Sequence, residues 1–372
     1  MTLVGKLVQS KTITGLLNKA SFLVYIATVL LLVGCDSGPE IIKISGTKMG
    51  TTYHVTVVAD QPAPADLAAR IDALLDTVDQ SMSTYKAASE LSRFNDQAVG
   101  TSQSISPDFA QVLAVSNRVW QDSDGAFDPT VGPLVDLWGF GPVATADVVP
   151  EQAQIDAAKA NVGYQYLTLL NSSGDNELTK TKPVRLDLSA VAKGYAVDLV
   201  ADLLEMLALP DYLVEVGGEM RLSGSNPEGM PWRIAIELPS LMPQVQRIIA
   251  VEDMAVATSG DYRNYFEQQG VRYSHTIDPR TGRPITHSLA SVTVLADQCA
   301  DADAWATAFM VLGDEEGMAL ANQLDIPVYM LVKEGAGFKA INSLAFEPYL
   351  SPADVLTDIA TEVMTDITRE EI

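Results

Sequence analysis

The stretch Asp187-Leu-Ser-Ala-Val-Ala-Lys-Gly-Tyr-Ala-Val-Asp198 predicts a strand that passes directly into a helix. Residues 184–188 read as the strand, and apolar residues recur at helical spacing over residues 192–208. A helix that begins with small residues leaves backbone N–H groups free in its first turn, where an anion can bind. Lys193 adds a positive charge at the same place. We therefore expect an anion-binding corner here, with an ordinary strand–helix corner and a solvated lysine as the alternative.

The rest of the chain alternates between helical and strand patterns without an internal repeat. Helices are expected at 65–82, at 107–123 with Ser106 as N-cap, from residue 150, and at 301–312; strands are expected at 53–58, 212–223, 231–238, and near 248–256, 274–277 and 291–295. Residues 128–142, rich in Gly and Pro, read as a structured loop. Because the strands lack regular βαβ spacing, we predict an α+β fold with mixed, largely antiparallel sheets and packed helices.

The first 34 residues read as a targeting segment. Lys6, Lys11 and Lys19 precede an apolar run over residues 22–32, and Leu-Val-Gly then leads to Cys35. This pattern resembles a bacterial lipoprotein signal, which implies cleavage after residue 34, lipidation of Cys35 and a lipid-anchored tether over 35–43. Asp36 implies retention at the inner membrane, on its periplasmic side. An uncleaved anchor is the alternative.

The chain is strongly acidic. It carries 48 Asp and Glu against 24 Lys and Arg, a formal charge of −24, which argues against nucleic acid or anionic lipid as a partner. A phosphorylated ligand would need local neutralisation by Lys, Arg, a helix N-terminus or a metal ion. With Cys35 acylated, Cys299 is the one thiol left, so no intramolecular disulfide is expected.

Two polar motifs could carry chemistry. Asp303 and Thr307 are four residues apart, so a helix would present both oxygens on one face, as Mg²⁺ prefers; an Asp-rich helix start favoured by the helix dipole is the alternative. His275 lies three residues before Asp278 and near Arg280 and Arg283. A titrating base beside guanidinium groups suits attack on a phosphoryl group, whereas a polar turn with a half-buried histidine is equally open.

Two weaker signals involve aromatic residues and glycines. Trp138 and Phe140 in the loop at 128–142 could clamp a flat heterocycle by stacking, although such loops more commonly only fold. The pair Gly217-Gly218 indicates a bulge or a close backbone approach to a ligand.

Eight motifs in this order resemble the ApbE family of FAD:protein FMN transferases. They are MGTTYHV near residue 50, MSTYKAASELSRFN at 82–95, GAFDPTVGPLVDLWGFG at 125–141, DLSAVAKGYAVD at 187–198, VEVGGEMRLSG at 214–224, TSGDYRNYF at 258–266, SHTIDPRTGRPI at 274–285 and DADAWATAFMVLG at 301–313. The match spans residues 44–330. It implies a two-lobed flavin transferase domain over 44–345, followed by an acidic tail over 346–372.

The resemblance implies transfer of FMN from FAD to a Thr or Ser hydroxyl of a target protein, with release of AMP. Mg²⁺ would be held by Asp303, Thr307 and the backbone carbonyl of Ala190. His275 would act as general base or orienter, with Asp278 as its partner. FAD contacts carry over to a larger set of positions: Met49, Tyr85, Ala126, Phe127, Asp128, Asp187, Lys193 and Ile277.

Family acceptors are typically subunits of membrane redox complexes of the Nqr or Rnf type, so such a subunit is the expected partner. Two other functions stay open from the sequence. One is a lipoprotein that binds FAD without chemistry, and the other is an FAD pyrophosphatase that releases FMN and AMP.

Overall fold

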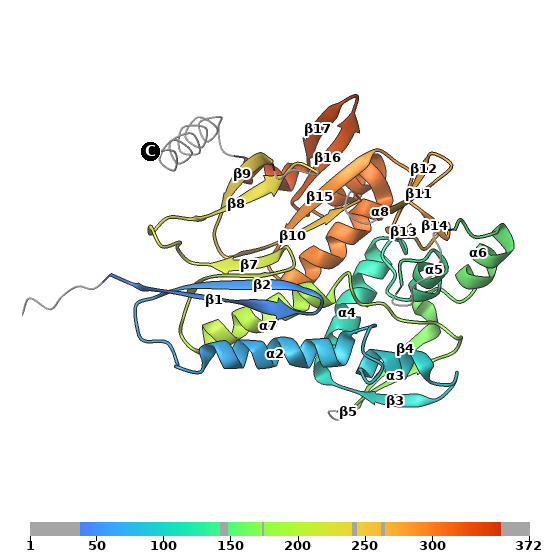
Figure 1. The fold of residues 1–372 in the computed structure, drawn as a ribbon, viewed down its shortest axis with the longest axis horizontal. Helices are drawn as coiled ribbons and strands as arrows, with labels where there is room; N and C mark the ends of the chain where they lie inside the picture. The colour runs from blue at the N-terminus through green and yellow to red at the C-terminus, as the bar shows by residue number, and fades with distance from the viewer. Residues whose placement is uncertain (1–37, 142–147, 173–174, 240–243, 262–264, 351–372) are drawn as a thin grey trace, which may run out of the picture. The chain divides into compact units, whose positions relative to one another are not determined.

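The computed structural model describes residues 38–141, 148–172, 175–239, 244–261 and 265–350 (Figure 1). The predicted signal segment, Cys35 and residues 351–372 lie outside these ranges. The described residues from Ile41 onward belong to one compact unit. Among the described residues, no helix combines the length and the apolar character needed to cross a membrane.

One eight-stranded sheet organises the fold. Its order is β1 (Glu40–Lys48), β2 (Thr51–Ala59), β6 (Asp211–Val216), β7 (Glu219–Ser223), β10 (Met254–Gly260), β15 (Leu289–Ala296), β16 (Val328–Glu334) and β17 (Gly337–Asn342). The pairings from β2 to β17 are all antiparallel. The predicted α+β class with largely antiparallel sheets is therefore confirmed.

Smaller sheets and the helices complete the described chain. The small sheets pair β3 (Ser102–Ile105) and β4 (Leu167–Ser172) with β5 (Asp175–Lys180), β8 (Trp232–Glu237) with β9 (Val245–Val251), β11 (Tyr265–Gln268) with β12 (Val271–Ser274), and β13 (Ile277–Asp278) with β14 (Arg283–Pro284). The helices are α2 (Leu67–Met82), α3 (Glu90–Asp96), α4 (Pro107–Asp122), α5 (Gly132–Leu137), α6 (Gln152–Lys159), α7 (Ala192–Met206) and α8 (Cys299–Gln323), with 3₁₀ turns η1 (Tyr164–Tyr166) and η2 (Leu344–Tyr349).

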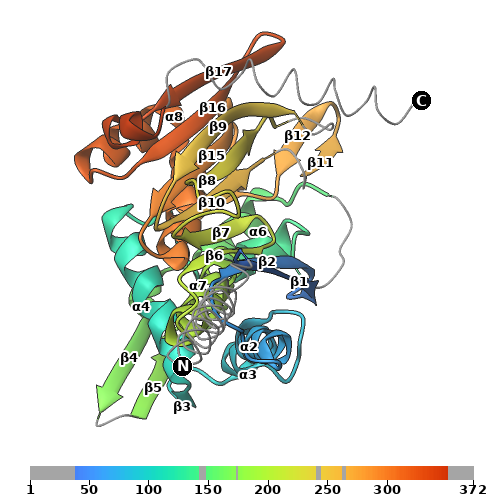
Figure 2. The same ribbon diagram turned by 90° about the vertical axis from the view of Figure 1, so that its left-hand side faces the viewer.

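The main sheet separates two apolar cores by the two-residue alternation of its strands. In β10, Ala255 and Ala257 face the larger core, which includes α7 and α8, whereas Val256 faces a second core under β8, β9 and η2. Helix α2 packs against α7 beside the β1–β2 hairpin (Figure 1), and the β3–β5–β4 sheet lies at the far end of the unit from β17 (Figure 2).

The periodic helices and strands agree with the sequence prediction. Helix α4 begins where expected because the Ser106 side chain accepts a hydrogen bond from the Phe109 amide and Pro107 occupies the first turn. The predicted end of the last helix at Leu312 coincides with a break in α8 at Gly313, where φ is 82° and ψ is −177°. The helix then resumes and runs to Gln323, beyond the prediction.

The predicted strand at 184–188 is wrong, because side chains replace the neighbouring strand. The Asn95 amide accepts from the Leu186 N–H at 2.7 Å and donates to the Leu186 carbonyl at 2.9 Å. The Lys180 ammonium donates to the Val184 carbonyl at 3.3 Å. The only ladder contact is an isolated bridge between Val131 and Arg185 in the described chain. The segment alternates buried and partly buried residues but belongs to no sheet.

Two other predictions change in detail. The loop at 128–142 contains α5, whose first turn accommodates Pro133. The single strand expected at 212–223 is a hairpin that turns at Gly217-Gly218, where φ is +64° and +105°, values that favour glycine.

The edges of the folded unit also differ from the predicted boundaries. Strand β1 begins at Glu40, inside the segment predicted as a tether, and η2 extends to Tyr349. Phe346, the first residue of the predicted acidic tail, is fully buried against Tyr329 in the second core. The first residues of that segment therefore belong to the folded unit.

We predict that Phe346→Ala lowers the free energy of unfolding by about 3–5 kcal/mol, because it leaves a cavity in the second core. Leu344→Ala, in the same 3₁₀ turn but 70% exposed, should change it by less than about 0.5 kcal/mol. Urea denaturation of both variants measures the difference. Equal effects of the two substitutions would contradict the assignment of residue 346 to the core.

Candidate active site

A cavity of about 730 Å³ opens where the β1–β2 turn, the corner at 187–193 and the start of α8 meet. Its volume lies within the range of small-molecule and cofactor sites. Twelve residues predicted for the flavin, the metal or catalysis line it: Met49, Tyr85, Ala126, Phe127, Asp128, Asp187, Ala190, Lys193, His275, Ile277, Asp303 and Thr307. Segments distant in the sequence thus meet in one cavity.

The corner before α7 is shaped by a local turn. The Asp187 carboxylate accepts from the Ser189 N–H at 2.9 Å and from its hydroxyl at 2.6 Å, as in an Asx turn. The Gly194 N–H in the first turn of α7 donates to the Asp303 carboxylate at 3.1 Å. The expected anion is therefore supplied, at this amide, by a side chain of α8.

The Lys193 side chain is 26% exposed and is held by three polar contacts, unlike a freely solvated lysine at a plain corner. Its ammonium lies 3.3 Å from Oε1 of Glu219 and 3.7 Å from Oδ2 of Asp303, and it donates to the Ser189 carbonyl at 3.1 Å. Burial lowers the pKa of Lys193, but the two carboxylates outweigh burial and raise it, so the lysine stays charged. We call Lys193, Glu219 and Asp303 the charge cluster.

Glu219 is a site residue that the sequence prediction missed. Burial raises the pKa of Glu219 to about 8, even though the nearby Lys193 opposes this shift. Burial raises the pKa of Asp303 as well, and Lys193 again acts in the opposite direction. Oε2 of Glu219 is buried without a hydrogen-bond partner among the described residues. The one available signal was an acid that directly follows Gly217-Gly218 in a strand pattern.

The charge cluster suits a cation. Two buried carboxylates share one ammonium, so the cluster is net negative when both acids are ionised, and among the described residues one carboxylate oxygen has no hydrogen-bond partner. Thr307 lies on the same face of α8 as Asp303, with Oγ 3.3 Å from the Ser259 hydroxyl. No group of three His, Cys, Asp or Glu residues in the described chain could hold a metal. A metal here would therefore rely on hydroxyl and carbonyl oxygens as well, which suits Mg²⁺.

Of the two residues predicted for catalysis, His275 lines the cavity and Asp278 does not. His275 lines the cavity and meets Phe140 edge-on, with ring centroids 6.3 Å apart. Asp278 does not line it; its carboxylate accepts from the Arg280 N–H at 2.8 Å and from the guanidinium at 3.1 Å. These contacts indicate that Asp278 holds the turn, and its assignment beside His275 stays a prediction.

Of the two arginines near His275 and the two aromatic residues expected as a clamp, only Phe140 lines the cavity. Arg280 binds Asp278 and Glu316, Arg283 binds Gln152, and neither arginine lines the cavity. Trp138 is buried, donates to the Gly282 carbonyl at 2.9 Å and stacks on Tyr273, so Phe140 alone of the two aromatics reaches the cavity. Lys193 is thus the cation nearest the proposed metal ligands.

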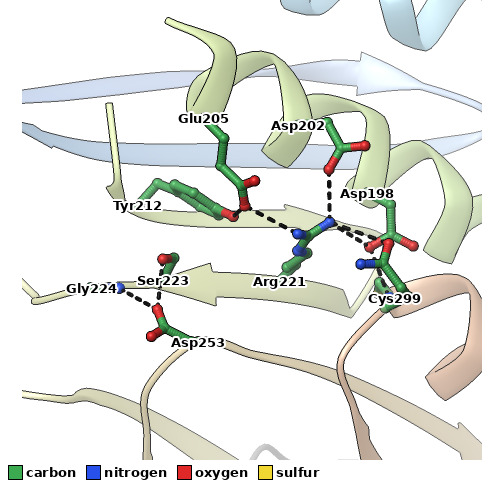
Figure 3. A network of polar contacts seen from close by, with 10 residues as sticks. Asp198, Asp202, Glu205, Tyr212, Arg221, Ser223, Gly224, Asp253 and Cys299 are labelled. Atoms are coloured by element: carbon green, nitrogen blue, oxygen red, sulfur yellow. Dashed lines mark hydrogen bonds and ion pairs between the residues drawn. The ribbon is translucent and has the colours of Figure 1, made fainter. Parts of the chain in front are cut away.

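A second polar network fixes the start of α8 (Figure 3). The Asp198 carboxylate accepts from the N–H groups of Cys299 at 2.8 Å and Ala300 at 2.9 Å, which caps the helix N-terminus. Arg221 approaches Asp198 at 3.3 Å and also binds Asp202 and Glu205. Burial raises the pKa of Asp198 to about 6, while the amides and Arg221 lower it.

The two helix starts also touch directly. A Cβ placed on Gly194 would lie 2.3 Å from the Cys299 carbonyl oxygen, so only glycine allows this approach. Contacts at residues 194 and 198 of α7 therefore hold the first turns of α8, and with them Asp303.

Comparison with known proteins agrees with this geometry. The ApbE family model matches residues 49–330. The chain belongs to the ApbE family. It is 49% identical over 336 residues to the FAD:protein FMN transferase of Vibrio cholerae serotype O1, covering 89% of this chain and 99% of that protein. It is 43% identical to the FAD:protein FMN transferase of Escherichia coli strain K12, covering 87% and 96%.

The fold agrees as well. The structure of the flavin transferase ApbE from Vibrio cholerae superposes with a TM-score of 0.78 at 47% identity, covering 84% of this chain and all of that one. Membership of the ApbE family thus rests on both sequence and structure.

We predict that Asp198→Asn lowers the free energy of unfolding by about 1–3 kcal/mol, because an amide can accept only one of the two helix N–H bonds. Asp202→Asn is the matched control, since that half-exposed side chain binds only Arg221 in this network. Its effect should stay below about 1 kcal/mol. A loss for Asp202→Asn as large as for Asp198→Asn in urea denaturation would argue against the capping role.

Proposed function

We propose that this chain transfers FMN from FAD to a Thr or Ser hydroxyl of a target protein and releases AMP. The observation that carries the proposal is the cavity of about 730 Å³, which is lined by the predicted flavin and metal positions and by the charge cluster. The names of the ApbE relatives support the same activity.

The reaction exchanges the phosphoanhydride bond of the FAD diphosphate for a phosphoester bond to the acceptor. The acceptor oxygen attacks the phosphorus on the flavin side of the diphosphate, a new O–P bond forms, and the bond to the bridging oxygen breaks. The electron pair of that bond leaves with AMP, and the acceptor hydroxyl loses its proton to a base. His275 is our candidate for the base or orienter because it is the histidine that lines the cavity.

The chain's own groups would orient the diphosphate in an otherwise acidic protein. Lys193 keeps its charge and lies against the acids of the cluster. Asp303, Thr307 and the Ala190 carbonyl would hold Mg²⁺, and the unpartnered oxygen of Glu219 supports a cation at this place. Bound Mg²⁺ would supply neutralisation of the diphosphate charge.

The location and the acceptor belong to the same proposal. Lipidation of Cys35 would anchor the enzyme to the periplasmic side of a bacterial inner membrane, near acceptor subunits of Nqr- or Rnf-type complexes. A tether to the same membrane raises the effective concentration of enzyme and acceptor.

The transferase predicts a fluorescent acceptor band after denaturing electrophoresis of a mixture with FAD and Mg²⁺. Asp303→Asn should reduce labelling at least about 100-fold, since it replaces a charged proposed metal ligand by a neutral amide. Asp301→Asn is the matched control in the same helix turn, because that side chain pairs with Arg118 and does not line the cavity. It should label normally.

Two other outcomes identify the alternative functions. Free FMN and AMP without a labelled band would assign an FAD pyrophosphatase, in which water attacks in place of the acceptor. Bound FAD that stays intact with all acceptors tested would assign an FAD-binding lipoprotein.

Removal of divalent cations should abolish labelling by the wild-type enzyme. EDTA followed by excess Mg²⁺ should restore it, whereas Na⁺ at equal ionic strength should not, because the oxygen ligands predicted here suit a hard divalent ion. Labelling that persists after EDTA treatment and dialysis would exclude a Mg²⁺ requirement.

A further inference from the structure

A second hollow adjoins the cavity on the β1–β2 turn. Its volume is about 590 Å³, and it is lined by Thr47, Lys48, Met49, Gly50, Thr51, Thr52 and Asp79. Met49, Gly50 and Asp79 line the main cavity as well. The two spaces therefore meet at this turn, and of the residues that line the second one only Met49 has a role assigned above.

The hollow is built on a two-residue hairpin turn. Met49 and Gly50 join β1 to β2 with φ of +54° and +74°, which is the left-handed geometry of a tight hairpin turn. Such a turn sets Thr47 opposite Thr52, and both side chains are exposed. A Cβ on Gly50 would meet no atom within 4 Å, so the space above the turn is open.

The polar groups of the hollow suit a neutral chain segment better than a second nucleotide. Lys48 is the only cation that lines it within the described chain, and this ammonium is held by Asp72 at 3.0 Å and Asp76 at 2.8 Å. Asp79 is held by Lys86 at 2.6 Å. With these charges paired, the hollow offers mainly threonine hydroxyls and backbone groups, which hydrogen-bond peptides and hydroxyl side chains.

Only a glycine separates the hollow from the charge cluster. Gly217 lies between Thr51 of the hollow and Lys193 of the cavity: a Cβ on it would lie 2.9 Å from Cγ2 of Thr51 and 3.3 Å from Cδ of Lys193. The Gly217 N–H donates to the Thr52 carbonyl at 3.0 Å, which joins the two hairpins at this point. A ligand in the hollow would thus lie beside the proposed reaction centre.

We propose that the hollow holds the Ser- or Thr-bearing segment of the acceptor polypeptide while FAD occupies the main cavity. The inference rests on the proposed transferase function, which needs a second substrate whose hydroxyl reaches the diphosphate. The hollow is open to solvent and continuous with the cavity, and the two charged side chains that line it are both ion-paired, so it fits an uncharged stretch of polypeptide.

The test fills the hollow without touching the catalytic positions. Thr47→Trp and Thr52→Trp place bulk in it, and tryptophan is favourable in strands, so the hairpin should persist. The substrates are FAD and the soluble domain of an Nqr-type acceptor subunit. We expect the KM for the acceptor to rise at least about tenfold, equivalent to 1.4 kcal/mol of binding, with the Kd for FAD changed less than about twofold.

Two further variants make the test independent of folding defects. The double change Thr47→Val and Thr52→Val removes both hydroxyls at nearly constant volume and should raise the acceptor KM about threefold or more. Ser104→Trp adds the same bulk at an exposed strand position outside both spaces and should leave both constants unchanged. Quenching of FAD fluorescence reports the flavin site in each variant.

Three results separate the possible failures. An unchanged acceptor KM in both tryptophan variants overturns the inference. A Kd for FAD that rises in step with the acceptor KM also overturns it, and assigns the hollow to the flavin. If the wild-type enzyme labels neither an Nqr- nor an Rnf-type domain, the proposed function itself fails and the inference fails with it.

Discussion

The position of the Lys193 ammonium between the carboxylates of Glu219 and Asp303 is the interaction on which the site depends. It joins three elements that are far apart in the sequence: the start of α7, the start of β7 and the first turns of α8. Two buried carboxylates beside one ammonium are costly to desolvate, and such clusters contribute little net stability. The fold tolerates the cluster because the Gly194 N–H and the Ser189 carbonyl satisfy part of it. We infer that its value lies in function, as a pair of carboxylates that a cation could bind beside a charged lysine.

The contacts around the charge cluster hold the elements that carry it in position. Gly194 allows the starts of α7 and α8 to touch, and Asp198 caps α8 one helical turn further along α7. Arg221 comes from β7, two residues after Glu219, so the strand that supplies one acid of the cluster also supports the cap. The sheet and the two helices therefore share their polar contacts as well as their apolar core.

The sequence predicts the regular elements of this fold well and the irregular ones poorly. Helices α2, α4 and α7 follow from apolar periodicity because each packs one face on the core. The segment 184–188 alternates apolar residues like a strand, with Val184, Leu186 and Leu188 all buried. Several of its backbone hydrogen bonds nevertheless go to the side chains of Asn95 and Lys180 and not to a neighbouring strand. Periodicity reports which side is buried, but it does not report what pairs with the backbone. The fold class could thus be predicted from the sequence, whereas the absence of a strand at 184–188 could not.

The site shows the same division between residue identity and contact. The resemblance to family motifs identifies the positions that meet in the cavity, because each motif can be recognised in the sequence by its characteristic residues. It does not identify Glu219, whose importance arises only when β7 lies beside the start of α7, or the engagement of Arg280 by Asp278 away from the cavity. This division also explains how a chain of net charge −24 can accommodate a dinucleotide. Long-range repulsion is screened within about 8–10 Å of salt solution, whereas contacts inside the cavity are not. The local arrangement of one lysine and two acids, with the cation that we propose there, would therefore decide binding, and the overall acidity of the surface does not prevent it.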